Sequence, residues 1–185
     1  MATTPNLSIA NEFVLRPANK AILAKVIEAF NEDRDSALAA LPWIDISLDI
    51  NRQLSDMLFD IESASDADRL HYWSIHDKNG NFAGMVGVGD ELQFANSHYN
   101  LGYWVKPSFR NQGIAIQSVN SILSWLESRG GPYRIEVAVH PHNKAGLATA
   151  EKIIKPILEK IEKDVKKQNG TFNFTREGSR KTGEG

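Results

Sequence analysis

The chain has 185 residues, no cysteine and a formal net charge of −2, with 42% hydrophobic and 24% charged residues. The lack of cysteine excludes disulfides, thiolate metal sites and a cysteine nucleophile. The small net charge gives no general attraction to nucleic acid or to an anionic membrane, and no apolar run approaches the roughly 20 residues of a membrane span. We therefore expect one soluble, cytoplasmic domain over residues 1–185.

The first part of the chain predicts one strand and two helices. Residues 12–17 are a short, mostly apolar segment that Pro17 ends, which is typical of a strand. Asn19 is a suitable N-cap for the first helix, and the second helix is expected from Asp49 to about Ser63. Apolar residues recur at helical spacing and predict the buried faces, namely Ile22, Leu23, Val26, Ile27 and Phe30, then Ile50, Leu54, Met57, Leu58 and Ile61.

An antiparallel hairpin is expected next. Residues 70–75 and 82–88 are rich in apolar and aromatic residues. Between them, residues 77–81 include Asn79-Gly80, a pair that readily adopts the positive φ of tight hairpin turns. These two segments therefore predict neighbouring strands.

The segment from Leu101 to Asn120 predicts a strand, a turn and a helix. Aromatic and branched residues alternate up to Val105, and Pro107 ends the strand. Between strand and helix lie residues 110–115, with the sequence RNQGIA. Free N–H groups at a helix start, a glycine and an arginine favour anion binding. An ordinary turn with a solvated arginine is the alternative.

The strand at residues 134–139 should lie parallel to the one that ends at Val105, because a helix connects the two. A helix from Lys144 to Ile153 follows, and Asn143 is its expected N-cap. Pro156 suits the first turn of a new helix, which we expect to reach Lys167. A last strand is expected at residues 172–178.

Three of these motifs resemble one family. RNQGIA resembles the Q/R-x-x-G-x-G/A signature of the GNAT superfamily of acetyl-CoA-dependent N-acetyltransferases, and LGYWVKPSFR is similar to the fourth strand and approach loop of its RimJ/RimL-type branch. HPHNKAGLATAEK is similar to the exit of the family's fifth strand. The resemblance covers residues 12–153, and residues 154–185 depart from it.

The resemblance implies an α/β fold. Its sheet is mixed but mostly antiparallel, is flanked by helices, and splays between the parallel fourth and fifth strands. The chain ends before the family's seventh strand, so either that strand is lost or a partner chain completes the sheet. An unfinished edge invites pairing, which makes a homodimer a reasonable expectation.

The resemblance also implies acetyl-CoA as acyl donor. Its pantetheine arm would lie between residues 103–105 and residues 137–139, with the N–H of Val105 as oxyanion donor. The implied cofactor-binding residues are Trp104, Val105, Arg110, Asn111, Gln112, Gly113, Ile114, Ala115 and Asn143.

The groups that transfer protons are harder to assign. Many relatives carry a glutamate near the position of Asn100, and RimJ/RimL-type enzymes often carry a serine at the position of Gly146. The remaining candidates are Glu136, His140 and Tyr103, with His142 beside them, because histidine titrates near neutrality and glutamate can accept a proton. A water chain could also deprotonate the amine, and no metal-ligand spacing is present.

The sequence therefore predicts transfer of an acetyl group to a primary amine, with a protein N-terminal amine as the leading acceptor. A small amine, such as a polyamine, an amino acid or an antibiotic, is the first alternative. A non-catalytic acyl-CoA-binding module is the second, because the changes at Asn100 and Gly146 favour it and the intact RNQGIA opposes it.

Overall fold

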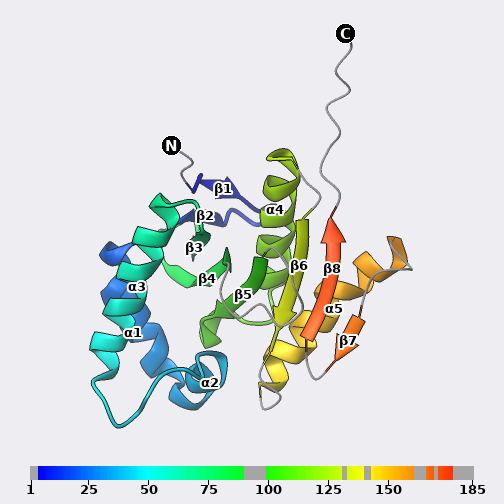
Figure 1. Ribbon diagram of the computed structural model, residues 1–185. Coiled ribbons are helices and arrows are strands. Elements are labelled where there is room, and N and C mark those ends of the chain that lie inside the picture. Colours follow the sequence, from blue (N-terminus) through cyan, green and yellow to red (C-terminus); the bar gives the residue numbers. More distant parts are fainter. Residues whose placement is uncertain are drawn as a thin grey trace.

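The computed structural model describes residues 4–89, 99–130, 133–139, 143–160, 166–168 and 171–176. Within these residues the strands form one sheet in the order β1-β2-β3-β4-β5-β6-β8-β7, in which only the β5–β6 pair is parallel (Figure 1). The strands are β1 (Leu7–Ser8), β2 (Val14–Pro17), β3 (Leu70–His76), β4 (Phe82–Gly89), β5 (Tyr99–Val105), β6 (Tyr133–Ala138), β7 (Lys166–Gln168) and β8 (Thr171–Arg176). The predicted mixed, mostly antiparallel α/β sheet is confirmed.

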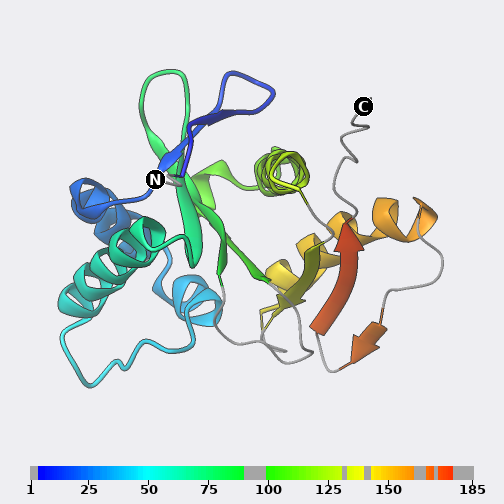
Figure 2. The ribbon, with the colours of Figure 1, turned by 45° about the horizontal axis from the view of Figure 1, so that its top comes forward.

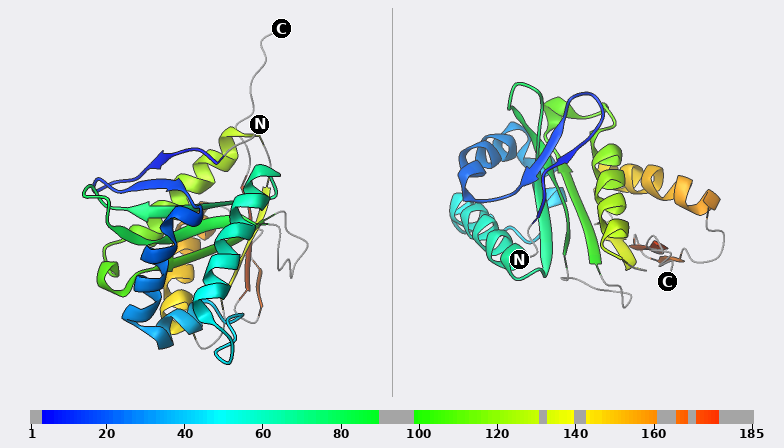
Figure 3. Two further views of the ribbon diagram at one scale, coloured as in Figure 1. Left: turned by 90° about the vertical axis from the view of Figure 1, so that its left-hand side faces the viewer. Right: turned by 90° about the horizontal axis from the view of Figure 1, so that it is seen from above.

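Helices cover both faces of the sheet. The 3-10 helix η1 (Lys20–Ile22) leads into α1 (Leu23–Glu32), followed by α2 (Arg34–Ala40) and α3 (Ile50–Asp66). A second 3-10 helix, η2 (Pro107–Phe109), precedes α4 (Ile114–Ser128), and α5 (Lys144–Lys160) follows β6. Seen from above, α1 and α3 lie on one side of the strands and α4 and α5 on the other (Figure 3).

Each face has its own apolar core. Strand alternation sends Trp73 and Ile75 to the α4 side, where they pack with Ile122, and sends Tyr72 to the α3 side. There Tyr72 packs against the cluster that includes Trp104. Burying a large apolar side chain stabilises the fold by roughly 1.5–3 kcal/mol, so the two clusters hold the helices on the sheet.

The predicted hairpin is present, but its turn is held differently from the prediction. Gly80 has a positive φ of 81°, whereas Asn79 does not adopt one. The carboxylate of Asp77 accepts hydrogen bonds from the backbone N–H groups of Asn79 and Asn81, at 2.9 and 2.8 Å. The Asp77 side chain, which starts the turn, therefore stabilises it together with the positive φ of Gly80, a contribution that was not predicted from the sequence.

Two elements near the N-terminus were not predicted. The short strand β1 pairs with β2, with Leu7 opposite Leu15. Helix α2 begins after Asp33, whose carboxylate accepts a hydrogen bond from the N–H of Ser36 at 3.1 Å. An N-cap at this position was the available signal, but helix α2 has only seven residues and little periodicity to detect.

The C-terminal prediction was wrong in two respects. Helix α5 runs without a break from Lys144 to Lys160, although Pro156 was expected to start a new helix. The expected helix to Lys167 is replaced by strand β7, and β8 pairs with β6 on one side and β7 on the other. A proline removes a single helical hydrogen bond, and the buried Ala150 and Ile153 already anchor α5 to the core. Two strands of the chain itself thus extend the sheet where we expected one.

A buried polar cluster ties the N-terminal segment to three elements. His71 on β3 is fully buried, with Nε2 2.7 Å from Asp68 Oδ1 and Nδ1 2.8 Å from Thr4 Oγ1. Arg129, after α4, donates to both carboxylate oxygens of Asp68 at 3.0 and 2.8 Å. A neutral imidazole satisfies the contacts with Asp68 and Thr4 when Nε2–H donates to Asp68 and Nδ1 accepts from Thr4. A terminal nitrogen of Arg129, which can only donate, also lies 3.2 Å from Nε2. Burial lowers the pKa of His71, and this effect outweighs the opposing attraction of Asp68.

We expect the fold to lose stability as the pH falls from about 7 to about 5. Burial lowers the pKa of both His71 and His76, so the unfolded chain takes up protons below about pH 6.5 while the folded chain resists them. Urea unfolding at a series of pH values measures the effect. The decline should be shallower in His71→Gln, and an equal slope in the two proteins would show that His71 stays out of the linkage.

Candidate active site

The end of β5 is held firmly to β4. The N–H of Lys106 donates to the carbonyl of Ala83 at 2.8 Å, and Gly84 lies opposite Val105 in the ladder. Because neighbouring residues of a strand direct their backbone groups to opposite edges, the N–H and C=O of Val105 and Tyr103 face away from β4. These groups therefore point toward β6.

The strands β5 and β6 separate almost at once. In the described part of the chain they pair only at Tyr99–Ile135 and Asn100–Glu136, although β5 continues to Val105. Figure 2 shows the two strands diverging from this point. The predicted splay is thus present, and it leaves the edge of β5 from Tyr103 to Val105 beside a gap in the sheet.

The turn after β5 leads into the N-terminus of α4. Asn111 and Gly113 both have positive φ, 63° and 74°, and Gly113 is the N-cap. A Cβ at Gly113 would meet only Gln117 Nε2, at 3.6 Å, so the backbone angle rather than crowding favours glycine here. The first hydrogen bond of the helix joins Gln117 N–H to the carbonyl of Gly113 at 3.1 Å.

The N–H groups of residues 114–116 therefore have no carbonyl partner within the helix. Together with the positive end of the helix dipole they form a site that suits a phosphate group. Ile114 is buried, so it can offer only its backbone, whereas Asn111 and Gln112 are exposed. Of the predicted cofactor-binding residues, Gln112 alone lines neither of the two cavities described below.

The side chain of Arg110 braces this turn. Its Nε donates to the carbonyl of Val105 at 3.1 Å, and one terminal nitrogen donates to the hydroxyl of Ser36 on α2 at 2.6 Å. It thus fastens the end of β5 to α2 while its charge lies beside the amides of α4. Contact of Arg110 with an anion stays a prediction.

Two cavities meet at the splay. One, of about 730 Å³, lies between β5, α3 and the α2–α3 connection, and the other, of about 210 Å³, reaches the start of α4. Their linings share five residues at the gap between β5 and α5, namely Ala40, Tyr103, Trp104, Asn143 and Gly146. The space between these shared residues, termed the passage, lies between the start of α4 and the larger cavity.

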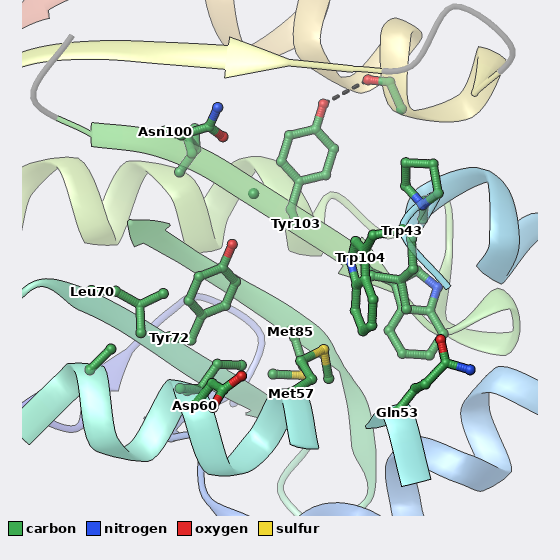
Figure 4. Close-up of a pocket in the computed structure, with 18 of the residues that line it drawn as sticks. Trp43, Gln53, Met57, Asp60, Leu70, Tyr72, Met85, Asn100, Tyr103 and Trp104 are labelled. Atoms are coloured by element: carbon green, nitrogen blue, oxygen red, sulfur yellow. Dashed lines mark hydrogen bonds between the residues drawn. The ribbon is translucent and has the colours of Figure 1, made fainter. Parts of the chain in front are cut away.

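Tyr103 crosses this passage. Its hydroxyl donates to the carbonyl of Gly146 at 2.6 Å, as the dashed line in Figure 4 shows. Burial raises the pKa of the Tyr103 phenol well above its usual value. The phenol therefore stays protonated near neutral pH, where it can donate a hydrogen bond and is unsuited to act as a base.

The predicted N-cap role of Asn143 is confirmed. Its Oδ1 accepts from the N–H of Gly146 at 2.9 Å, while Asn143 also lines both cavities. A Cβ at Gly146 would lie 2.5 Å from Asn143 Nδ2 and 2.9 Å from Val139 Cγ1. A serine at position 146 would therefore require the side chains of Asn143 and Val139 to shift.

Glu136 and Asn100 form a pair that the sequence did not reveal. They lie opposite each other in the β5–β6 ladder, and Asn100 Nδ2 donates to Glu136 Oε1 at 3.1 Å. Glu136 is fully buried, and Asn100 lines the larger cavity. The third predicted candidate, His140, lies outside the described residues, as does His142.

The passage carries a further donor. Trp104 is buried, lines both cavities, and its Nε1–H has no hydrogen-bond partner among the described residues. A cofactor with a diphosphate and an amide-containing arm fits this set, because the amides of α4, the outward backbone groups of Tyr103 and Val105, and Trp104 all offer hydrogen bonds.

Within the described ranges, no cluster of His, Asp and Glu could hold a metal ion. None of the helices in those ranges has the length and apolar composition of a membrane span.

Comparisons with known proteins agree with this geometry. Residues 12–153 match the acetyltransferase (GNAT) domain family, and no curated protein matches the chain. An acetyl transferase from Salmonella typhimurium that modifies the N-terminal serine of ribosomal protein L7/L12 has a TM-score of 0.71 at 16% identity, covering 94% of this chain and 99% of that one.

Two further solved structures are similar. The ribosomal-protein-S5-alanine acetyltransferase from Vibrio fischeri has a TM-score of 0.68 at 15% identity, covering 95% of this chain and 98% of that one. RimJ from Mycobacterium smegmatis, in complex with a CoA disulfide, has a TM-score of 0.65 at 16% identity, covering 92% and 86%. Identities this low show a shared fold and leave the acceptor open.

The family match spans most of the chain, and the glycine turn and splayed strands lie inside it. This protein therefore belongs to the GNAT acetyltransferase family and is an acetyl-CoA-dependent N-acetyltransferase.

Proposed function

We propose that this enzyme acetylates the N-terminal amine of a protein or peptide. The observation that carries the proposal is the cavity of about 730 Å³ on the α3 side of the splay. Pockets of roughly 300–1,000 Å³ accept drug-sized ligands, so the space exceeds what a small amine needs and suits the first residues of a chain. The similar Salmonella and Vibrio enzymes, by their descriptions, act on ribosomal proteins, which supports this acceptor class.

The lining of the cavity suits a cationic chain end. Trp43 and Phe59 are 51% and 52% exposed, and both belong to the lining. Asp56 and Asp60, one turn apart on α3, belong to it as well. Carboxylates attract an ammonium group, and the exposed aromatic rings offer contact area to the side chains that follow it.

Residues of the turn and of β5 would hold the cofactor, which supplies the thioester whose acetyl group is transferred. The N–H groups at the start of α4 would bind the diphosphate, with the charge of Arg110 beside them. The N–H of Val105 would stabilise the carbonyl oxygen as it gains charge. Trp104 Nε1–H and Asn143 Nδ2 are donors on the two walls of the passage.

Glu136 is the residue that we expect to receive the proton of the amine. The carboxylate is held by Asn100, five residues before Val105 on β5. Five residues of strand span about 17 Å, so Glu136 must act through intermediate groups rather than by direct contact. Tyr103, which stays protonated, would donate a proton to the departing thiolate after its hydroxyl leaves the carbonyl of Gly146.

Replacement of Gly113 by valine should weaken acetyl-CoA binding by about tenfold or more, because a branched residue resists φ near 74° and the amides of α4 would turn away. Isothermal titration calorimetry measures the affinity. Gly130→Val is the matched control, since Gly130 at the other end of α4 has φ 92° and lies outside both cavities. Equal losses of affinity in both variants would show that strain alone is responsible.

Replacement of Glu136 by glutamine should lower kcat by about 10²-fold near neutral pH, since the amide keeps the shape and the acceptor oxygen for Asn100 but cannot take up a proton. Release of CoA is measured with saturating acetyl-CoA, and its affinity should not change. A rate within tenfold of the wild type would instead favour a water chain that delivers the proton to bulk solvent.

A panel of acceptors tests the proposed function. CoA release is compared for peptides with free N-termini, for the same peptides with blocked N-termini, and for polyamines and amino acids. We expect turnover with the free peptides and none with the blocked ones. Turnover confined to small amines would replace the proposal with the first alternative.

A homodimer stays a prediction that sedimentation of the same samples can test.

A further inference from the structure

The ring of Tyr72 lies across two glycines of the neighbouring strands. Tyr72 on β3 is opposite Gly87 on β4, which is opposite Gly102 on β5, so the three form one row across the sheet. A Cβ at Gly87 would overlap the ring, and a Cβ at Gly102 would lie 2.6 Å from the Tyr72 hydroxyl oxygen. The two glycines therefore leave the space in which this side chain reaches from β3 to β5.

The hydroxyl reaches the larger cavity beside the splay. Tyr72, Asn100 and Gly102 all line that cavity, and Figure 4 shows Tyr72 directed toward β5 between Asn100 and Tyr103. Gly102 lies two residues from Asn100 and three from Val105 along β5. At about 3.4 Å per residue, the Tyr72 hydroxyl beside Gly102 lies about 7 Å along β5 from Asn100, which holds Glu136. It lies about 10 Å from Val105, where the acetyl group would bind.

We propose that Tyr72 relays the proton of the acceptor amine toward Glu136, an inference that rests on the proposed function. The acceptor ammonium loses one proton, which passes through water to the Tyr72 oxygen. The proton of the phenol passes in turn, through water beside Asn100, to the carboxylate of Glu136. The amine ends neutral and able to attack, the phenol is unchanged, and Glu136 holds the proton. Each span is longer than a single water molecule bridges, so the proton crosses it along a chain of hydrogen-bonded waters between the polar groups at its two ends.

The two glycines make room for different groups. A Cβ at Gly87 would overlap ring carbons of Tyr72 and also the backbone carbonyl of His71, so glycine is required there even without the hydroxyl. The overlap at Gly102 involves the hydroxyl oxygen, so glycine at this position leaves room for the polar end of the side chain.

The test is Tyr72→Phe, which keeps the ring over Gly87 and removes only the hydroxyl. With a free N-terminal peptide near pH 7, kcat/KM for the peptide should fall about tenfold or more. The defect should shrink toward pH 9, because an α-amino group with a pKa of about 7.7–8.0 is already neutral there. The melting temperature and the calorimetric affinity for acetyl-CoA should stay at the wild-type values.

A pair of alanine variants tests the position of the hydroxyl. Gly102→Ala places a Cβ against the Tyr72 oxygen and should give the same pH-dependent loss. Gly89→Ala is the control, because its Cβ would approach only the side chain of Leu70, at 3.1 Å. It should leave the pH profile unchanged.

Three results would overturn the relay. If kcat/KM of Tyr72→Phe stays within twofold of the wild-type value at every pH, the relay is excluded and the proposed function stands. A loss of equal size at every pH would make Tyr72 a packing residue. No wild-type turnover with any amine would overturn both proposals together.

Discussion

The parting of β5 and β6 is the constraint on which this molecule depends. After two paired residues the strands diverge, and the backbone groups of Tyr103 and Val105 face a gap instead of a neighbouring strand. An unpaired buried N–H or C=O costs roughly 1–3 kcal/mol, so the gap carries a cost that a continuous sheet avoids. Arg110 offsets part of it, since its Nε takes up the carbonyl of Val105. The backbone groups of β5 at the gap that Arg110 does not contact can form hydrogen bonds with an amide-containing ligand.

The neighbours of the gap are arranged to keep it open. Asn143 caps α5 beside the passage, and Gly146, which accepts the hydrogen bond of Tyr103, adds no side chain there. Tyr103 crosses the passage, and its hydrogen bond to Gly146 is the contact that joins β5 to α5 there. On the opposite wall Trp104 packs into the α1–α3 core while its N–H remains in the passage. The apolar cores on both faces therefore position the polar groups between them.

In the proposed mechanism, the proton-accepting group lies one strand away from its position in many relatives. Relatives often carry a glutamate near position 100 of β5, whereas here the carboxylate belongs to Glu136 of β6 and Asn100 supports it. Parallel pairing at this one position makes the exchange possible, because the two side chains point to the same face side by side. Asparagine at position 100, which in the sequence favoured a non-catalytic module, thus supports a carboxylate in the fold.

The sequence by itself determined the features that depend on local geometry. The alternation up to Val105, the stop at Pro107, the glycine at position 113 and the stripe of α4 specify a strand, a turn and a helix within some 25 residues. Only the tertiary structure decided which distant side chains meet, including the Asn100–Glu136 pair and the row of Tyr72 over Gly87 and Gly102. The physical reason is register: a one-residue slip between strands sends each of these side chains to the other face, and no local pattern records it. The strand β8 was expected from the sequence, whereas β7 was missed for the same reason, since it exists through its pairing with β8.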